Sequence, residues 1–138
     1  MNYLPAAGVV ILKEQEDGEH DVICLLTHTG KIDLTKGIID PGEQPMQTAM
    51  REAEEEASIT DLDFKFGEDP LVHDATTMYV AETTQEPEIQ RNPHSGIFEH
   101  KIALMIPLKK LANDPRLLEY LRPAVEYAHE LVYNKPPE

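Results

Sequence analysis

The amino-acid sequence predicts an α/β fold in which helices pack against a mixed β-sheet. Apolar, β-branched runs and helical patterns follow one another in the order strands, helix, strands, helix. Residues 115–133 add apolar side chains at a spacing of three to four, which is typical of an amphipathic helix. The 138 residues contain no linker or repeat, so we expect a single domain over residues 1–138.

The first elements are expected to be two strands. Residues 6–13 (AAGVVILK) are almost wholly apolar, and residues 21–28 (DVICLLTH) form a second run of this kind. Asp17-Gly18 lies between them and favours a hairpin turn. Residues 29–33 are short and polar, and we expect them to lead into a glycine loop.

A turn and a helix are expected next. Asp40-Pro41-Gly42 predicts a tight turn, because proline presets φ and glycine accepts a positive φ. A helix should run from about Pro45 to Ala57, since proline is tolerated in the first helical turn.

The second half of the chain should hold further strands at residues 62–66, 76–82 and 97–108. Residues 86–95 contain Pro87 and Pro93 and are interpreted as a loop. The helix at 115–133 has an apolar face that suits either the sheet or a second chain. Its sequence therefore leaves a monomer and a homodimer open.

Charge and composition limit the partners and the compartment. The net charge of −14 argues against a nucleic-acid backbone or an anionic membrane as a general surface partner. Anionic small molecules remain possible if a metal ion supplies positive charge. A lone Cys24 in an apolar run favours an inert thiol and a reducing compartment. No apolar run reaches the ~18 residues of a membrane span, and Met1-Asn2-Tyr3 lacks a basic region, so we expect a cytoplasmic protein.

The helix at 45–57 carries an unusual group of glutamates. Glu52, Glu55 and Glu56 recur at i, i+3 and i+4 and fall within an arc of ~100° on one face. Such like-charge pairs cost ~0.2–0.5 kcal/mol each, and residues that work against their own helix are expected at functional sites. The alternative is an ordinary solvated acidic face, as expected for Glu54. An adjacent apolar arc should anchor the helix through Met46, Ala49, Met50, Ala53 and Ala57.

The stretch from Gly37 to Ile59, GIIDPGEQPMQTAMREAEEEASI, resembles the signature of the Nudix hydrolases. That signature reads Gly-x5-Glu-x7-Arg-Glu-apolar-x-Glu-Glu-x-Gly-apolar. Five residues separate Gly37 from Glu43, and seven separate Glu43 from Arg51. One position departs from the signature, with Ser58 where the family has glycine.

The resemblance implies a Nudix-type α/β/α sandwich that cleaves a pyrophosphate bond in a nucleoside diphosphate joined to another group, with Mg²⁺ or Mn²⁺ and a water nucleophile. Arg51 would orient the site by pairing with Glu43, and Lys36 would face substrate phosphate. The implied metal ligands are Glu52, Glu55, Glu56 and the carbonyl of Gly37.

The resemblance leaves the catalytic base open between Glu52 and a glutamate outside the signature. That second candidate is Glu99, which several family members match with a glutamate that binds metal or activates water. The adjacent His100 would touch phosphate, the alternative being a structural histidine.

The substrate is less well marked. Ala6-Ala7-Gly8-Val9-Val10, Lys36-Gly37 and Glu99-His100 resemble the asymmetrical diadenosine tetraphosphate hydrolases. The chain has no Trp, so adenine would stack on Tyr79, Tyr120 or Tyr127. The alternatives are an ADP-ribose or nucleotide-sugar pyrophosphatase, an RNA 5′-end pyrophosphohydrolase and, in another class, a non-catalytic nucleotide-binding module.

Overall fold

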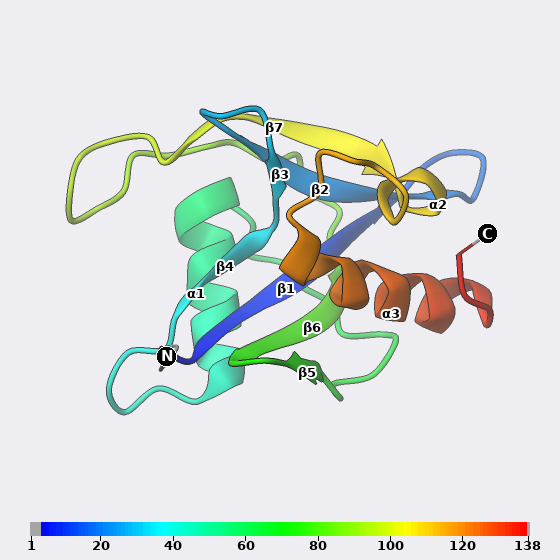
Figure 1. The fold of residues 1–138 in the computed structure, drawn as a ribbon, viewed down its shortest axis with the longest axis horizontal. Helices are drawn as coiled ribbons and strands as arrows, with labels where there is room; N and C mark the ends of the chain where they lie inside the picture. Colours follow the sequence, from blue (N-terminus) through cyan, green and yellow to red (C-terminus); the bar gives the residue numbers. More distant parts are fainter. Residues whose placement is uncertain (1–3, 138) are drawn as a thin grey trace.

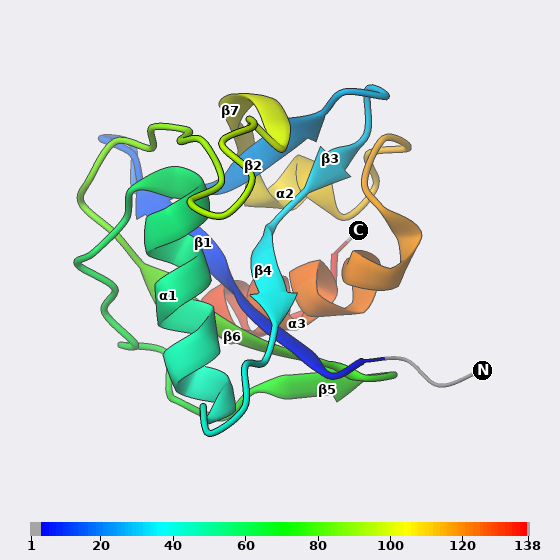
Figure 2. The same cartoon turned by 90° about the vertical axis from the view of Figure 1, so that its left-hand side faces the viewer.

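The structure is a computed structural model that describes residues 4–137 (Figure 1). The expectation drawn from Met1, Asn2 and Tyr3 therefore falls outside the described residues. A mixed seven-stranded sheet has α1 on one face and α3 on the other, which confirms the predicted helix-covered mixed sheet (Figures 1 and 2). Within residues 4–137, no helix is long and apolar enough to cross a membrane.

The elements follow one another in a strand-rich order. The strands are β1 (Ala6–Glu14), β2 (His20–Thr27), β3 (Ile32–Asp33), β4 (Thr35–Ile38), β5 (Leu71–His73), β6 (Thr76–Glu82) and β7 (His100–Pro107). The helices are α1 (Pro45–Ala57), α2 (Leu108–Leu111), the 3₁₀ turn η1 (Glu119–Leu121) and α3 (Arg122–Tyr133).

Strand β1 is the centre of the sheet. One edge pairs in parallel with β6. The other edge is shared, since residues 6–9 pair with β4 and residues 12–14 pair with β2, both antiparallel. Strand β2 then diverges to pair with β7 and β3. This division leaves β4 beside α1, so the glutamate helix packs on both β1 and β4.

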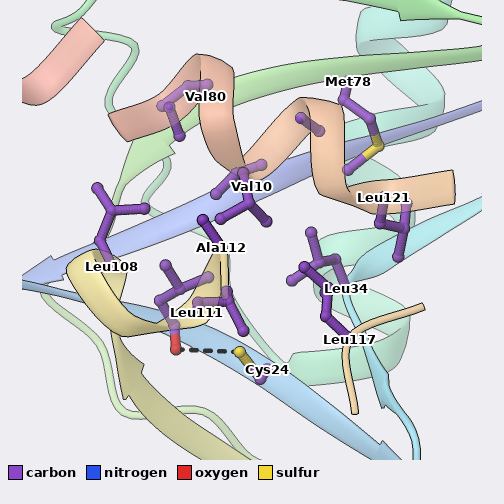
Figure 3. Close-up of a cluster of buried hydrophobic side chains, with 14 of the residues drawn as sticks. Val10, Cys24, Leu34, Met78, Val80, Leu108, Leu111, Ala112, Leu117 and Leu121 are labelled. Carbon is purple, nitrogen blue, oxygen red and sulfur yellow. Dashed lines mark hydrogen bonds between the residues drawn. The ribbon is translucent and has the colours of Figure 1, made fainter. Parts of the chain in front are cut away.

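The two faces of β1 hold two separate cores. Val9 and Ile11 join the cluster beneath α1. Val10 and Leu12 point the other way, into a larger aliphatic cluster that also receives α2, α3 and β2. Figure 3 shows this larger cluster, in which the Cys24 thiol donates to the Val22 carbonyl at 3.5 Å. Burial raises the pKa of the Cys24 thiol, as expected for an inert cysteine.

Two predictions were wrong: that residues 29–33 lead into a glycine loop, and that residues 62–66 form a strand. Residues 29–33 do not simply precede a loop, because β3 and β4 occupy 32–33 and 35–38. In 62–66 only Asp63 bridges to Glu82, and Gly67, with φ of 109°, turns the chain immediately afterwards. The short strand β5 was missed, since three residues carry too little pattern.

The C-terminal boundaries also moved. The strand expected at 97–108 begins at His100 and ends at Pro107, and Leu108 starts α2. The helix expected at 115–133 begins only at Arg122. Leu117 and Leu118 are instead held extended beside β3, where the Leu118 amide donates to the Ile32 carbonyl at 3.0 Å. Leu117 and Leu118 are spaced as in a helix, but they are apolar because they pack against the core as extended chain.

Candidate active site

Helix α1 ends where the sequence predicts. Gln44 and Gln47 form a reciprocal capping box, with Pro45 in the first turn. The helix stops at Ser58, whose φ of 61° is left-handed. Ser58 occupies the one position where the chain departs from the signature, which has glycine there. Glycine is favoured at this position because it adopts a positive φ without strain.

The face of α1 that packs on the sheet is built of small residues. The described buried positions of the helix are Thr48, Ala49, Ala53 and Ala57. Met46 packs against the same cluster, but Met50 is 45% exposed, so its expected anchoring role was wrong. Glu54 is exposed, as predicted. Alanines keep α1 near the sheet, which brings its glutamates close to the backbone of β4.

Glu56 is the most deeply placed of the three glutamates. Its side chain is 9% exposed, and its Oε1 accepts the backbone amide of Lys36 at 2.8 Å. Burial raises the pKa of Glu56 to about 9, and the neighbouring Glu52 and Asp33 carboxylates add to this, although the bond from Lys36 opposes it. The site therefore disfavours negative charge on Glu56 in the absence of a cation.

Glu52 lies against the glycine of the signature. A Cβ built on Gly37 would overlap the carboxylate of Glu52, so only glycine leaves room for this approach. Burial raises the pKa of Glu52 to about 7, with a further contribution from Glu55 and Glu99, while Arg51 lowers it. Gly37 and Glu52 are thus fitted to one another by shape.

Arg51 connects the glutamates to the turn before α1. Its Nε donates to Glu43 Oε2 at 2.8 Å and its Nη2 donates to Glu43 Oε1 at 3.0 Å, which is a bidentate pair. Its Nη1 donates to Glu52 at 3.0 Å and to Glu55 at 3.2 Å. Hydrogen bonds from Arg51 and Thr48 lower the pKa of Glu43 to about 2.

A second polar chain reaches Glu56 from the sheet. His100 Nε2 lies 3.1 Å from Asp33 Oδ2, and its Nδ1 lies 3.9 Å from Glu56 Oε2. Lys36 Nζ pairs with Asp33 Oδ1 at 3.1 Å and lies 5.5 Å from the centroid of the Tyr120 ring. Burial opposes the charge on Lys36, but Asp33 and Tyr120 outweigh it and raise its pKa.

Sequence reasoning missed Asp33. The available signal was an acidic residue between two apolar ones, Ile32 and Leu34, both of which are fully buried. Burial alone would raise the pKa of Asp33, but the bonds from His100 and Lys36 lower it overall. Asp33 therefore stays ionised beside the site.

The loop before β7 forms one wall of the site. In Figure 2 this yellow-green segment passes over the C-terminal end of α1. Asn92 in the loop donates to Glu99 Oε1 at 2.7 Å. A small open pocket lies between loop and helix, lined by Glu52, Glu55, Glu56, Ile89, Gln90, Asn92, Pro93, Glu99 and His100. The structure thus brings together the three helix glutamates and the two candidates at 99 and 100.

The donor set in this pocket fits a divalent cation. Ligand atoms of Glu56, Glu99 and His100 all lie within 4.8 Å of one another. Carboxylate oxygens suit Mg²⁺ and Mn²⁺, and the raised pKa values of Glu52 and Glu56 mark a site whose negative charges lack compensation. A cation would remove that penalty.

The structure places the candidate tyrosines apart. Tyr79 is 8% exposed in the core beneath α1, with Phe64 packed edge-on at 6.3 Å between centroids. It is therefore not open to stack on adenine. Tyr127 donates its hydroxyl to the Asp69 carbonyl at 2.6 Å. Tyr120 is exposed, beside Lys36.

Comparison with known proteins gave a family and a set of similar folds. Residues 2–126 match the model described as NUDIX domain. An Ap4A hydrolase of C. elegans, solved as a binary complex, is 22% identical with a TM-score of 0.67, over 95% of this chain and 93% of that chain. The Nudix hydrolase RenU of M. smegmatis is 16% identical with a TM-score of 0.71, over 98% and 89%. The NUDIX domain of Shewanella oneidensis NrtR, complexed with ADP ribose, is 16% identical with a TM-score of 0.63, over 94% and 88%. No curated protein matched the chain.

Proposed function

The chain belongs to the Nudix hydrolase family, which acts on pyrophosphate bonds, and from this premise we propose that it cleaves a nucleoside polyphosphate with the help of Mg²⁺ or Mn²⁺. The preferred substrate is diadenosine tetraphosphate, cleaved asymmetrically. The observation that carries the proposal is the gathering of Glu52, Glu55, Glu56 and Glu99 around one open pocket.

The helix glutamates would hold the cation. Glu52, Glu55 and Glu56 present carboxylates to the pocket, and the carbonyl of Gly37 is proposed as a further ligand. A bound divalent ion would polarise a phosphate oxygen and lower the pKa of water. Arg51, which is paired with Glu43, fixes the carboxylates of Glu52 and Glu55 in place by its remaining donors.

Two carboxylates are the candidates to take a proton from the attacking water. The carboxylate of Glu52 lies against Gly37, beside the Glu55 and Glu56 carboxylates that would hold the cation. Glu99 is exposed and is oriented by Asn92. Both line the pocket, so we propose the proton acceptor is one of these two, and the substitution that flattens the rising limb of the pH–rate profile identifies it.

The substrate would extend from the cation towards Lys36 and Tyr120. Tyr120 lines a second open pocket with Leu4, Asp74, Ala75 and Thr76. We assign the adenine-stacking role to Tyr120 in place of Tyr79, because its ring is accessible. Lys36 would offset phosphate charge, and His100 would position Glu56 between helix and sheet.

A substrate panel tests this proposal. Purified protein with Mg²⁺ or Mn²⁺ is given diadenosine tetraphosphate, ADP-ribose, nucleotide sugars and a 5′-triphosphorylated RNA, and the products are separated by chromatography. We expect ATP plus AMP from diadenosine tetraphosphate. Faster release of AMP plus ribose 5-phosphate from ADP-ribose would replace the preferred substrate. Folded, metal-loaded protein that turns over no compound would instead be a binding module.

A further inference from the structure

A second group of ligand-type side chains lies away from the pocket, on the face of the sheet that α3 covers. Glu14 ends β1, His20 begins β2 and Glu82 ends β6. The register pairs Glu14 with His20, and Leu12 with Glu82. Since side chains alternate along a strand, Leu12 and Glu14 share a face, and the register brings His20 and Glu82 to that same face.

The three side chains converge at distances that suit one metal ion. His20 Nε2 lies 3.3 Å from Glu82 Oε2 and 3.8 Å from Glu14 Oε2. All three ligand atoms lie within 4.8 Å of one another. Metal–ligand bonds of about 2.0–2.2 Å in a tetrahedral site separate neighbouring ligand atoms by about 3.3–3.6 Å. Modest side-chain movement would complete this arrangement.

Two of these side chains carry buried polar atoms that make no hydrogen bond to the described part of the chain. His20 is 9% exposed, and neither of its ring nitrogens has a hydrogen-bond partner among the described residues. Glu82 Oε2 is likewise buried and unpartnered. The two atoms are close but not aligned for a hydrogen bond. Buried polar atoms are normally satisfied, so this pair needs an explanation.

We propose that Glu14, His20 and Glu82 form a second divalent-cation site, which takes a borderline ion such as Zn²⁺. An imidazole nitrogen with two carboxylates favours such an ion over Mg²⁺, which prefers oxygen and retains water. Lys65 Nζ pairs with Glu82 Oε1 at 3.1 Å, which leaves Oε2 to face the ion. The exposed Glu14 leaves a path from solvent.

The surroundings of His20 determine how tightly the proposed site should bind a metal ion. The ring is held edge-on by Phe66 and Tyr133, at 6.0 and 6.4 Å between centroids. Its Nδ1 lacks the acceptor that usually orients a metal-binding histidine, and loss of such an acceptor weakens binding by about 10–100-fold. The ion would join the ends of β1 and β6 to the start of β2. Its expected role is therefore to stabilise the fold, and not to take part in catalysis.

Cobalt is the probe for this site, because four-coordinate Co²⁺ absorbs visible light much more strongly than six-coordinate Co²⁺. The full chain is titrated with Co²⁺, and Zn²⁺ is then added in competition. We expect a strong visible band that Zn²⁺ abolishes. Because Glu56 and His100 offer similar donors in the pocket, the titration is repeated on Glu56→Gln, where the band should persist.

Matched variants locate the band. Glu14→Gln and His20→Gln should abolish it, whereas Glu16→Gln, an equal charge change at an exposed neighbour, should leave it intact. In the Glu56→Gln background, which removes a ligand of the pocket, Zn²⁺ at a hundredfold excess over its dissociation constant should raise Tm by about 5–10 °C. The same rise is expected when Glu16→Gln is added, but not when Glu14→Gln is added. Glu14 is exposed, so its variant should fold even if His20→Gln does not. Absence of a strong band, or a band unchanged in Glu14→Gln, would overturn the proposal.

Discussion

The two faces of the sheet, one covered by α1 and the other by α3, are lined by different kinds of side chain. On the α3 side, α2 and the turn η1 press large aliphatic side chains into the larger core, as Figure 3 shows for Leu111 and Leu121, and α3 adds Val125 beside two alanines. Helix α1 buries mainly alanines, and its adjoining face turns carboxylates towards β4 and the pocket. Helices α1 and α3 both contact β1, whose alternating side chains serve the two faces.

The difference separates stability from chemistry. Burial of aliphatic surface on the α3 face stabilises the fold by about 25 cal/mol per Å². On the α1 face, burial instead raises the pKa values of Glu52 and Glu56, which means that their ionised forms oppose folding. Substitutions on the two faces should therefore have opposite signatures.

The largest effect on stability should come from the α3 face. Leu111→Ala removes a fully buried side chain and should lower the unfolding free energy by about 2–5 kcal/mol. Turnover per folded molecule should stay at the wild-type level. Urea unfolding and active-site-normalised assays measure both, with the half-buried Leu131→Ala as a milder control. A loss of turnover in folded Leu111→Ala would break the separation between the faces.

Two glycines on facing strands provide the next test. Gly37→Ala would displace the flexible carboxylate of Glu52, so activity should fall by about 10–100-fold with little change in stability. Gly8→Ala meets the Thr35 carbonyl and the Lys36 backbone, and should instead destabilise by about 1–3 kcal/mol. Turnover and urea unfolding are measured for both. Equal loss of stability in the two variants would contradict the fitted pair of Gly37 and Glu52.

The pH dependence of stability should also differ between the faces. In the unfolded chain both glutamates ionise near 4.5, but burial raises the pKa to about 7 for Glu52 and about 9 for Glu56. Between these limits the folded protein holds more protons, so its stability falls as pH rises. This favourable contribution is complete below about pH 4.5 and is lost as pH rises through about 7 to 9.

Urea unfolding of EDTA-treated protein at several pH values above about 5 measures this decline. That range avoids Glu43, whose pKa of about 2 gives the opposite slope only in acid. Leu111→Ala should keep the wild-type slope, because it removes no titrating group. Stability that rises from pH 6 to pH 9 would contradict the raised pKa values.

The smallest effect is expected at the helix ends. Ser58 and Asn134 both end a helix with a positive φ, at 61° and 59°. Asn134→Gly should raise stability by up to about 1 kcal/mol, because glycine accepts this conformation. Ser58→Gly should change it by less than about 0.5 kcal/mol, since it also removes the hydrogen bond that Ser58 donates to the Glu88 carbonyl at 2.8 Å. Thermal unfolding measures the stability of both variants. An equal gain in both would show that the Ser58–Glu88 hydrogen bond contributes nothing to stability.

The parts of the site that the sequence predicted are those coded locally. Helix 45–57 was correct at both ends, because its cap, its proline and its repeat of glutamates lie within one short stretch. Its partners on the sheet were not readable in this way. Asp33 reaches the site only because β3 pairs with β2, and Tyr79 is buried because β6 runs beneath α1. The locations of Asp33 and Tyr79 depend on how strands distant in sequence pair, and local sequence patterns carry no information about that pairing.

Glu56→Gln tests the central claim most directly, when turnover and unfolding are measured on the same preparation. The amide keeps the size of the side chain and can still accept the Lys36 amide, but it removes the charge. We predict a loss of activity of about 10²–10³-fold, while the metal-free variant at pH 8 is at least as stable as the wild type. The control, Glu54→Gln on the exposed side of α1, should change neither. A Glu56→Gln protein that is destabilised yet retains wild-type turnover per folded molecule would contradict the account.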